Sequence, residues 1–233
     1  DRRQRQMCIR DRTSANNYLV NLNGTRHISF RDMSFSSSNF YYANLLYLHN
    51  STFKVAVNNC SFNGPVNTGY SGTSNIYSGN SGNNHYLRVN QCNFKGGYYG
   101  IYAYGYYNNN TRIRGIHVSN STFTNQTYYG IYAYRMNRSK LINNTFYRSG
   151  TTSWYGAYLN DCDSALNIVG NTFYSPYYGS GLYLYGCNAT LSEHSLVANN
   201  FIAIQDSSNT SYDALRLSSC TYTDVLFNNV SNN

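Results

Sequence analysis

The heptapeptide Tyr98-Tyr-Gly-Ile-Tyr-Ala-Tyr104 returns letter for letter at Tyr128–Tyr134, 30 residues further along the chain. Each copy is followed by a segment that ends in Asn-x-x-Phe, at Phe123 and at Phe146. An internal repeat of this length is typical of proteins that stack copies of one structural unit. We therefore expect the chain to be built from one repeated coil.

The repeat extends beyond these two copies once its two halves are separated. The first half is a small residue, an apolar residue, any residue and a second apolar residue. It occurs at Gly100–Ala103, Gly130–Ala133, Gly156–Leu159, Gly181–Leu184 and Ala214–Leu217. The second half ends in a phenylalanine that follows Asn, Ser or Thr. These anchors are Phe35, Phe62, Phe94, Phe123, Phe146, Phe173 and Phe201, with Val230 in the last copy.

Within each half the apolar residues recur at every second position. In Ile101–Tyr104 and Leu182–Tyr185 an aliphatic or small residue alternates with tyrosine. This period of two is typical of strands, and no stretch sustains the i, i+3, i+4 pattern of a helix. Short strands at a regular period, without helices between them, predict an all-β solenoid.

Phrases of the type Gly-Ile-x-Ala, and of the type Ile-x-Asn-Asn-Thr-Phe as in Leu141–Phe146, resemble those of the right-handed parallel β-helix repeat proteins of the pectate-lyase-like superfamily. The resemblance covers residues 18–230 and implies a right-handed parallel β-helix of about eight coils, forming one domain over residues 13–233. It also implies a secreted bacterial surface protein, with an extracellular or cell-surface location. The superfamily includes lyases, hydrolases, epimerases and non-catalytic surface proteins, so the resemblance leaves the function open.

Residues 1–12 do not follow the repeat. They carry five of the 17 basic residues and show no alternation. They resemble the translated adapter sequence that contaminates some sequencing reads, and we interpret them as a non-native segment; the alternative is a basic nucleic-acid arm or a targeting segment. The sequence also ends without a polar capping repeat, so we expect it to be a fragment of a longer protein, which would explain the missing signal peptide.

Composition excludes several classes of protein. Charged residues make up only 11% and aromatic residues 17%, the opposite of a disordered chain. Without residues 1–12 the net charge falls from +8 to +5, and no basic cluster remains that would track phosphates. We therefore expect no nucleic-acid partner, and no apolar run is long enough to predict a membrane span.

The cysteines fall into the same columns as other compact residues. Cys162, Cys187 and Cys220 follow the position of Met136, and Cys60 and Cys92 share the column in which we place Ser121, Asn144, Asn171, Asn199 and Asn228. No Cys or His spacing is typical of a zinc site. Stacked free thiols are the simpler prediction, and a disulfide between Cys162 and Cys187 is the alternative.

The outward positions beside the aliphatic column are mostly tyrosine, which predicts a flat and nearly uncharged aromatic face. It comprises Tyr98, Tyr99, Tyr102, Tyr104, Tyr128, Tyr129, Tyr132, Tyr134, Trp154, Tyr155, Tyr158, Tyr183 and Tyr185. One interpretation is a ladder that only stabilises the sheet. The other is a glycan-binding platform, in which rings stack on sugar faces and phenol hydroxyls bond to sugar hydroxyls.

Catalysis by a β-helix of this type requires grouped carboxylates, either to hold Ca²⁺ in a lyase or to act as an acid–base pair in a hydrolase. The best candidates are Asp161 and Asp163, but Asp161 shares a column with Arg135, which predicts a cross-strand ion pair. We therefore expect a non-catalytic protein without cofactor or metal. Its expected role is binding, adhesion or display at a surface, with polysaccharide as the ligand. The alternatives are a polysaccharide lyase or glycoside hydrolase acting on pectin-like polymers, with Ca²⁺ only in the lyase case, and a purely structural stalk.

Overall fold

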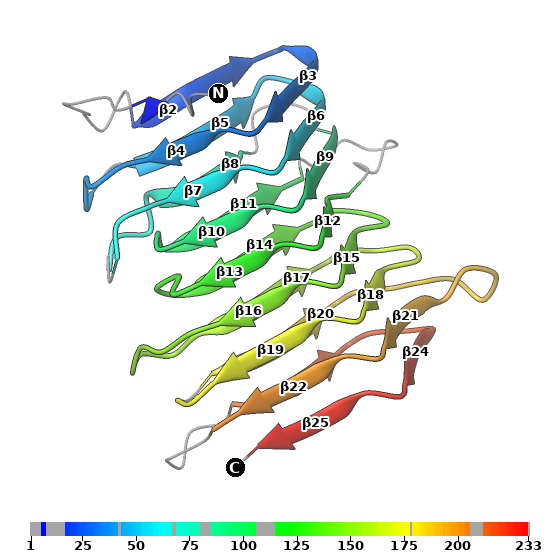
Figure 1. The fold of residues 1–233 in the computed structure, drawn as a ribbon. Helices are drawn as coiled ribbons and strands as arrows, with labels where there is room; N and C mark the ends of the chain where they lie inside the picture. Colours follow the sequence, from blue (N-terminus) through cyan, green and yellow to red (C-terminus); the bar gives the residue numbers. More distant parts are fainter. Residues whose placement is uncertain are drawn as a thin grey trace.

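The structure is a computed structural model that describes residues 6–7, 17–41, 43–66, 69–79, 85–105, 115–177, 179–205 and 212–232. Throughout these ranges the regular elements are β-strands, and they form three parallel sheets that wrap around one long core (Figure 1). The predicted all-β solenoid is therefore confirmed.

The first sheet, which we call the tyrosine sheet, contains the repeated heptapeptide. Its strands are β2 (Tyr18–Asn23), β5 (Ala43–His49), β8 (Thr73–Ser78), β11 (Tyr99–Tyr104), β14 (Tyr129–Tyr134), β17 (Tyr155–Asn160), β20 (Ser180–Tyr185) and β23 (Leu215–Ser218).

The second sheet, which we call the lateral sheet, follows the tyrosine sheet in each coil. Its strands are β3 (Arg26–Arg31), β6 (Phe53–Asn58), β9 (His85–Asn90), β12 (His117–Ser119), β15 (Lys140–Ile142), β18 (Asn167–Val169), β21 (Ser195–Ala198) and β24 (Thr223–Leu226).

The third sheet, which we call the phenylalanine sheet, completes each coil. Its strands are β1 (Gln6–Met7), β4 (Ser34–Ser36), β7 (Ser61–Asn63), β10 (Asn93–Lys95), β13 (Thr122–Thr124), β16 (Thr145–Tyr147), β19 (Thr172–Ser175), β22 (Phe201–Ile204) and β25 (Asn229–Asn232). Seven turns separate β2 from β23, so the chain makes about seven turns, slightly fewer than the eight coils predicted.

Successive coils pair in register, so residues one coil apart become direct neighbours. Ile101 pairs with Ile131 and with Ile76, and all three are buried. On the phenylalanine sheet the rings of Phe35, Phe62, Phe94, Phe123, Phe146 and Phe173 stack with centroids 4.6–4.9 Å apart. This phenylalanine ladder lies in the core, and its spacing matches the roughly 4.8 Å between paired strands.

One predicted anchor is wrong by a single residue. Phe173 pairs with Ile202, which is buried, whereas Phe201 faces outward and is 44% exposed. The same shift places Asn200, not Asn199, in the column of buried amides. Asn199 instead takes the left-handed corner conformation, with φ of 53°, that Gly170 adopts in the preceding coil. Two asparagines followed by two apolar residues leave the register of this coil ambiguous in the sequence.

The corner between the lateral and phenylalanine sheets is held by a ladder of side-chain amides. Asn171 Oδ1 accepts from both the backbone N–H and the Nδ2 of Asn144, each at 3.0 Å. Asn171 Nδ2 donates to the carbonyl of Leu141 at 2.8 Å and to Asn200 Oδ1 at 3.0 Å. Asn200 repeats the pattern with Asn228. These side chains satisfy backbone groups that the turn leaves unpaired inside the protein.

The stacked cysteines are free. Cys60, Cys92, Cys162, Cys187 and Cys220 carry no disulfide, so the simpler of the two predictions is confirmed. The thiol of Cys187 donates to the carbonyl of Leu159 at 3.4 Å. Hydrogen bonding to the Cys187 thiol, followed by burial, raises the pKa of Cys220. Cys187 and Cys220 are therefore compact residues of the stack that stay protonated.

Only part of the N-terminal segment falls within the described residues. Gln6 and Met7 form β1, which pairs with Ser34 and Phe35 of β4. The rest of residues 1–12, including Cys8, lies outside the described part of the chain, and the interpretation of this segment as non-native stays a prediction.

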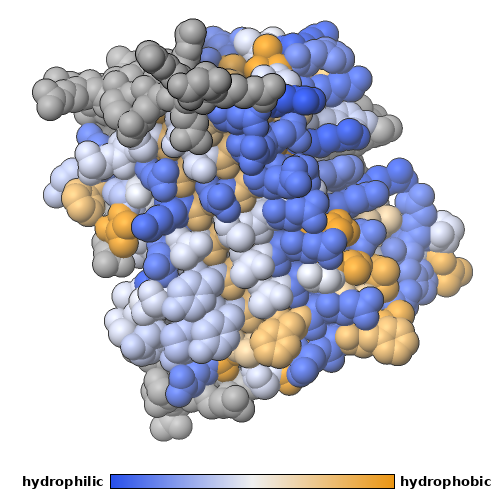
Figure 2. Space-filling model, in the orientation of Figure 1, coloured by the Kyte–Doolittle hydropathy of each residue, from blue (hydrophilic) through white to orange (hydrophobic). Residues whose placement is uncertain are grey.

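The last coil at the C-terminal end exposes apolar side chains. Val225, Leu226, Phe227 and Val230 are exposed, and apolar atoms are visible there on the surface (Figure 2).

The amide ladder yields a stability prediction. Asn171→Ala removes the hydrogen bonds that this side chain makes to the preceding and the following coil. It leaves buried backbone groups unpaired, so the free energy of unfolding should fall by about 2–4 kcal/mol. Urea denaturation measures the change. Asn63→Ala, which alters an exposed side chain of the phenylalanine sheet, is the control and should change stability by less than about 0.5 kcal/mol. Equal effects of the two substitutions would contradict the role of the ladder.

Candidate functional site

A row of six tyrosines runs along the outer side of the tyrosine sheet. Strand alternation turns Ile101 and Ala103 into the core and Tyr102 outward. Because the coils are in register, the equivalent tyrosines lie one above another. This tyrosine ladder consists of Tyr47, Tyr77, Tyr102, Tyr132, Tyr158 and Tyr183.

The rings of the tyrosine ladder touch along its whole length. Centroids of successive rings are 4.7–5.5 Å apart, and the pairs are stacked except for Tyr132 and Tyr158, which meet edge to face at 82°. The same column holds Asn21 in the coil before Tyr47 and Arg216 in the coil after Tyr183. The Arg216 guanidinium lies 4.9 Å from the Tyr183 ring. The ladder thus links six coils in one continuous aromatic column.

A second aromatic column flanks the tyrosine ladder. Tyr99, Tyr129 and Tyr155 stack at 5.2 and 5.3 Å, and Tyr99 meets Tyr102 edge to face at 5.0 Å. Tyr98 stacks on Tyr128 at 5.3 Å beside this column. The structure therefore brings these predicted site residues together on one face.

On the other side of the ladder the aromatic surface is interrupted. Tyr104 and Tyr134 lie 4.7 Å apart, with the Arg135 guanidinium 4.6 Å from the Tyr134 ring. Asn160 pairs with Tyr134 of the preceding coil and with Tyr185 of the following coil, so it separates these two tyrosines in the column. Tyr185, which is 42% exposed, meets Tyr183 edge to face at 6.3 Å.

Trp154 was predicted to belong to this surface, and that prediction is wrong. Its side chain is fully buried in the core, and its indole Nε1 has no hydrogen-bond partner among the described residues. Trp154 precedes β17, so strand alternation does not fix the direction of its side chain as it does for Tyr155. The large apolar indole is instead buried, which removes its surface from water.

Sequence reasoning missed Tyr47 and Tyr77, which extend the ladder by two coils. Both lie between residues that alternate as in the heptapeptide, in Leu46-Tyr-Leu48 and Ile76-Tyr-Ser78. Leu45 and Asn75 stand where the later coils have glycine, so the small-residue signal is absent. The alternation alone was the signal that would have found them.

Burial keeps several phenol hydroxyls of this face protonated. Burial, followed by repulsion from neighbouring phenolates, raises the pKa of Tyr155 and of Tyr158 to about 12. Burial likewise raises the pKa of Tyr99, Tyr102, Tyr129 and Tyr132. At neutral pH each of these six hydroxyls is therefore neutral and able both to donate and to accept a hydrogen bond.

The two carboxylates considered for catalysis have separate partners. Asp161 Oδ2 lies 3.7 Å from Arg135 Nε, which confirms the predicted ion pair. Asp163 Oδ1 accepts a hydrogen bond from the backbone N–H of Asn188 at 2.9 Å. Within the described ranges, no group of three or more His, Cys, Asp or Glu side chains is arranged to hold a metal ion.

No helix among the described residues has the length and apolar character needed to span a membrane.

The raised phenol pKa values predict a loss of stability at high pH. In the unfolded chain tyrosines ionise near pH 10, while the folded chain holds its phenol protons longer, so stability should fall as pH rises above 10. We expect on the order of 1 kcal/mol per shifted ring, after allowance for solvent screening at these partly exposed sites.

Urea denaturation at pH 8 and pH 11 measures this effect. The double variant Tyr155→Phe and Tyr158→Phe has no phenols to ionise at these positions, so it should lose less stability than the parent over the same interval. The same loss in parent and variant would show that these phenols are not desolvated.

Comparison with protein-family models shows which family the chain belongs to. The family model described as the right-handed beta helix region matches residues 44–220, which is most of the chain and covers the tyrosine ladder and the phenylalanine ladder from Phe62 to Phe173. A search of curated proteins finds no matching relative. The match also supplies the handedness predicted for the coils. This chain thus belongs to the right-handed β-helix family.

Proposed function

We propose that this chain is a non-catalytic binding or display module that attaches to polysaccharide through its tyrosine face. The observation that carries the proposal is the six-ring tyrosine ladder with its flanking column of Tyr99, Tyr129 and Tyr155. A single outward column of one residue type, sustained over six coils, offers the repeated contacts that a repeating polymer can use. With this role we propose an extracellular or cell-surface location.

The stacking geometry favours a binding mode other than the expected stacking of sugar faces on tyrosine rings. The ring faces of the ladder are turned toward one another, at interplanar angles of 6–15° in four of the five pairs. Ring faces are therefore largely occupied, and the surface offered consists of ring edges and phenol hydroxyls. A row of neutral hydroxyls with a spacing of about 5 Å suits hydrogen bonding to sugar hydroxyls along an extended chain.

The character of the face favours a glycan over a charged polymer. Its rings are half-buried, so the carbon–hydrogen groups of a sugar can pack against the exposed ring edges. The phenol hydroxyls can at the same time hydrogen-bond to the sugar hydroxyls. Charged groups occur at its margins, at Arg135 and Arg216, and each of these has a carboxylate neighbour in Asp161 or Asp213. The centre of the face is uncharged.

The mutual stacking of the rings also favours a second candidate, a purely structural stalk. Cross-strand aromatic pairs stabilise a sheet without any ligand, and the ladder would then serve only to hold the coils together. The enzymatic alternative is less well supported, because Asp161 and Asp163 are each engaged with a different neighbour.

Substitution of tyrosine by phenylalanine separates binding from stability. The triple variant Tyr102→Phe, Tyr132→Phe and Tyr158→Phe keeps the stacked rings and removes three hydroxyls. Because each hydrogen bond contributes about 0.5–1.5 kcal/mol, affinity for a polysaccharide found by glycan-array screening should fall at least about tenfold, with little change in stability.

The matched control is Tyr147→Phe with Tyr174→Phe. These two rings also stack, at 5.8 Å, but they lie on the phenylalanine sheet. The control should bind as the parent does. Unchanged binding by the triple variant, or a parent protein that binds no glycan, would favour the structural stalk.

A further inference from the structure

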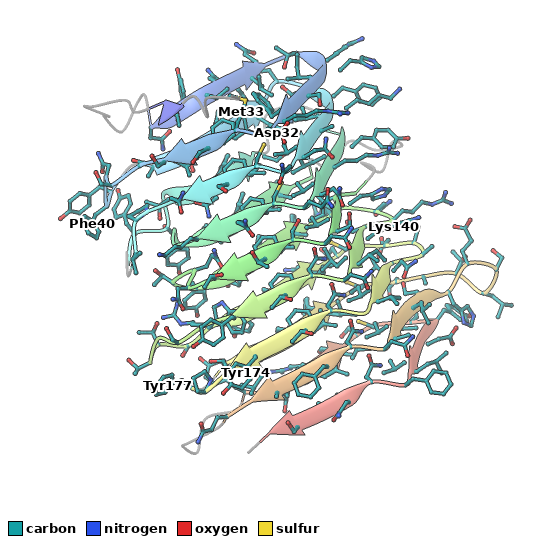
Figure 3. The ribbon with its side chains drawn as sticks, in the orientation of Figure 1. Asp32, Met33, Phe40, Lys140, Tyr174 and Tyr177 are labelled. Carbon is teal, nitrogen blue, oxygen red and sulfur yellow. The ribbon has the colours of Figure 1, made fainter. Side chains whose placement is uncertain are left out.

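A column of cations lies on the outer side of the lateral sheet. Arg88 of β9, His117 of β12 and Lys140 of β15 are direct register partners on three successive coils. Arg88 and Lys140 are exposed, and His117 between them is half-buried. Lys140 lies on the lateral-sheet side of the molecule, away from the phenylalanine sheet (Figure 3). The positions that precede and follow in this column are Ala56 and Asn167.

This arrangement disfavours a positive charge on His117 unless an anion compensates it. Paired strands lie about 4.8 Å apart, so a protonated imidazole would lie directly between two cations, and like charges on neighbouring strands destabilise a sheet. Some of the other described surface cations have carboxylate partners, as in Arg135 with Asp161 and Arg216 with Asp213. The described residues provide no ion pair for Arg88 or for Lys140. The next cation, Arg138, is held by Glu193 at 2.6 Å.

The groups around His117 are arranged to favour an added negative charge. Burial, then the charges of Lys140 and Arg88, lower the pKa of His117, while the backbone carbonyl of Arg138 opposes the shift. Ser119, the next outward residue of β12, donates to Asn90 Oδ1 at 2.9 Å and so adds a neutral polar border. The long side chains of Arg88 and Lys140 can reach over the imidazole from both sides.

We propose that Arg88, His117 and Lys140 form an oxyanion-binding site on the lateral sheet. Guanidinium, ammonium and imidazolium together supply charged donors to the oxygens of a sulfate, phosphate or carboxylate group. The ligand is either a free oxyanion or such a group carried on a polysaccharide. The site lies on a different sheet from the tyrosine face, so it stands independently of the function proposed above.

Binding at this site is linked to protonation of His117. The free protein holds His117 neutral at pH 7, and a bound anion stabilises its protonated form. Binding therefore takes up a proton, raises the pKa of His117, and becomes tighter as pH falls from 7.5 to 5.5. The groups that act on the imidazole are the side chains of Arg88 and Lys140 and the backbone carbonyl of Arg138. A change in pH thus acts on a site whose other two members stay charged.

The test follows the imidazole of His117 by NMR in histidine-labelled protein, with the signal assigned from a His117→Asn variant. Sodium sulfate is compared with sodium chloride at matched ionic strength, so that screening alone is the same. We expect sulfate to raise the pKa of His117 more than chloride does, and Arg88→Gln or Lys140→Gln to weaken sulfate binding at least about tenfold. Lys95→Gln, an exposed cation of the phenylalanine sheet, is the control and should leave binding unchanged.

Further arms identify the source of the oxyanion. Inorganic phosphate, polygalacturonate and dextran sulfate are titrated in the same way, the last two carrying carboxylate and sulfate on a polymer. Tighter binding of one polymer than of any free anion assigns the site to an anionic polysaccharide, and the reverse assigns it to a small oxyanion. A His117 pKa that responds equally to all salts, or a sulfate response that persists in the Arg88→Gln, Lys140→Gln double variant, would overturn the proposal.

Discussion

In-register parallel pairing between successive coils is the constraint on which the rest of this structure depends. It places residues one coil apart about 4.8 Å from each other, so every column of the sequence becomes a line of touching side chains. Ring stacking from Phe35 to Phe173 follows directly, because planar rings fit that spacing. The amide ladder follows as well, since Asn171 and Asn200 each reach a backbone carbonyl of the preceding coil and the side-chain amide of the following coil. The core is therefore built from columns of similar contacts.

The same constraint produces different effects on the two outer faces. Where the repeated residue is tyrosine, stacking is favourable, and the coils gain an aromatic column with a row of neutral hydroxyls. Where neighbouring residues are Arg88, His117 and Lys140, the column places two cations on either side of an imidazole and leaves positive charge that a ligand can neutralise. One face therefore gains stacking contacts within the solenoid, and the other offers charge to an anion. This contrast is why we assign a hydrogen-bonding role to the first face and an electrostatic role to the second.

The fold and most of the columns were predictable from the sequence because period-two alternation and the repeat fix which residues face inward. The Arg135–Asp161 ion pair and the free thiols were also predictable, since register alone brings those residues together. The register of the seventh coil was not, because Asn199-Asn200-Phe201-Ile202 satisfies the repeat in two ways. Trp154 was misplaced because it lies just outside its strand, where alternation gives no direction. Ring orientation in the tyrosine ladder depends on packing between neighbours, and no single sequence position encodes it.

The most direct test of this account is a disulfide cross-link between exposed outer positions of the phenylalanine sheet. Thr122 and Thr145 are register partners, so their Cα atoms lie at about the strand spacing, within the range that a disulfide spans. Thr122 and Thr172 are two coils apart, about 10 Å, which is too far. Under mild oxidation the Thr122→Cys, Thr145→Cys variant should cross-link and the Thr122→Cys, Thr172→Cys variant should not. A cross-link in the second variant, or none in the first, would contradict in-register stacking of the coils.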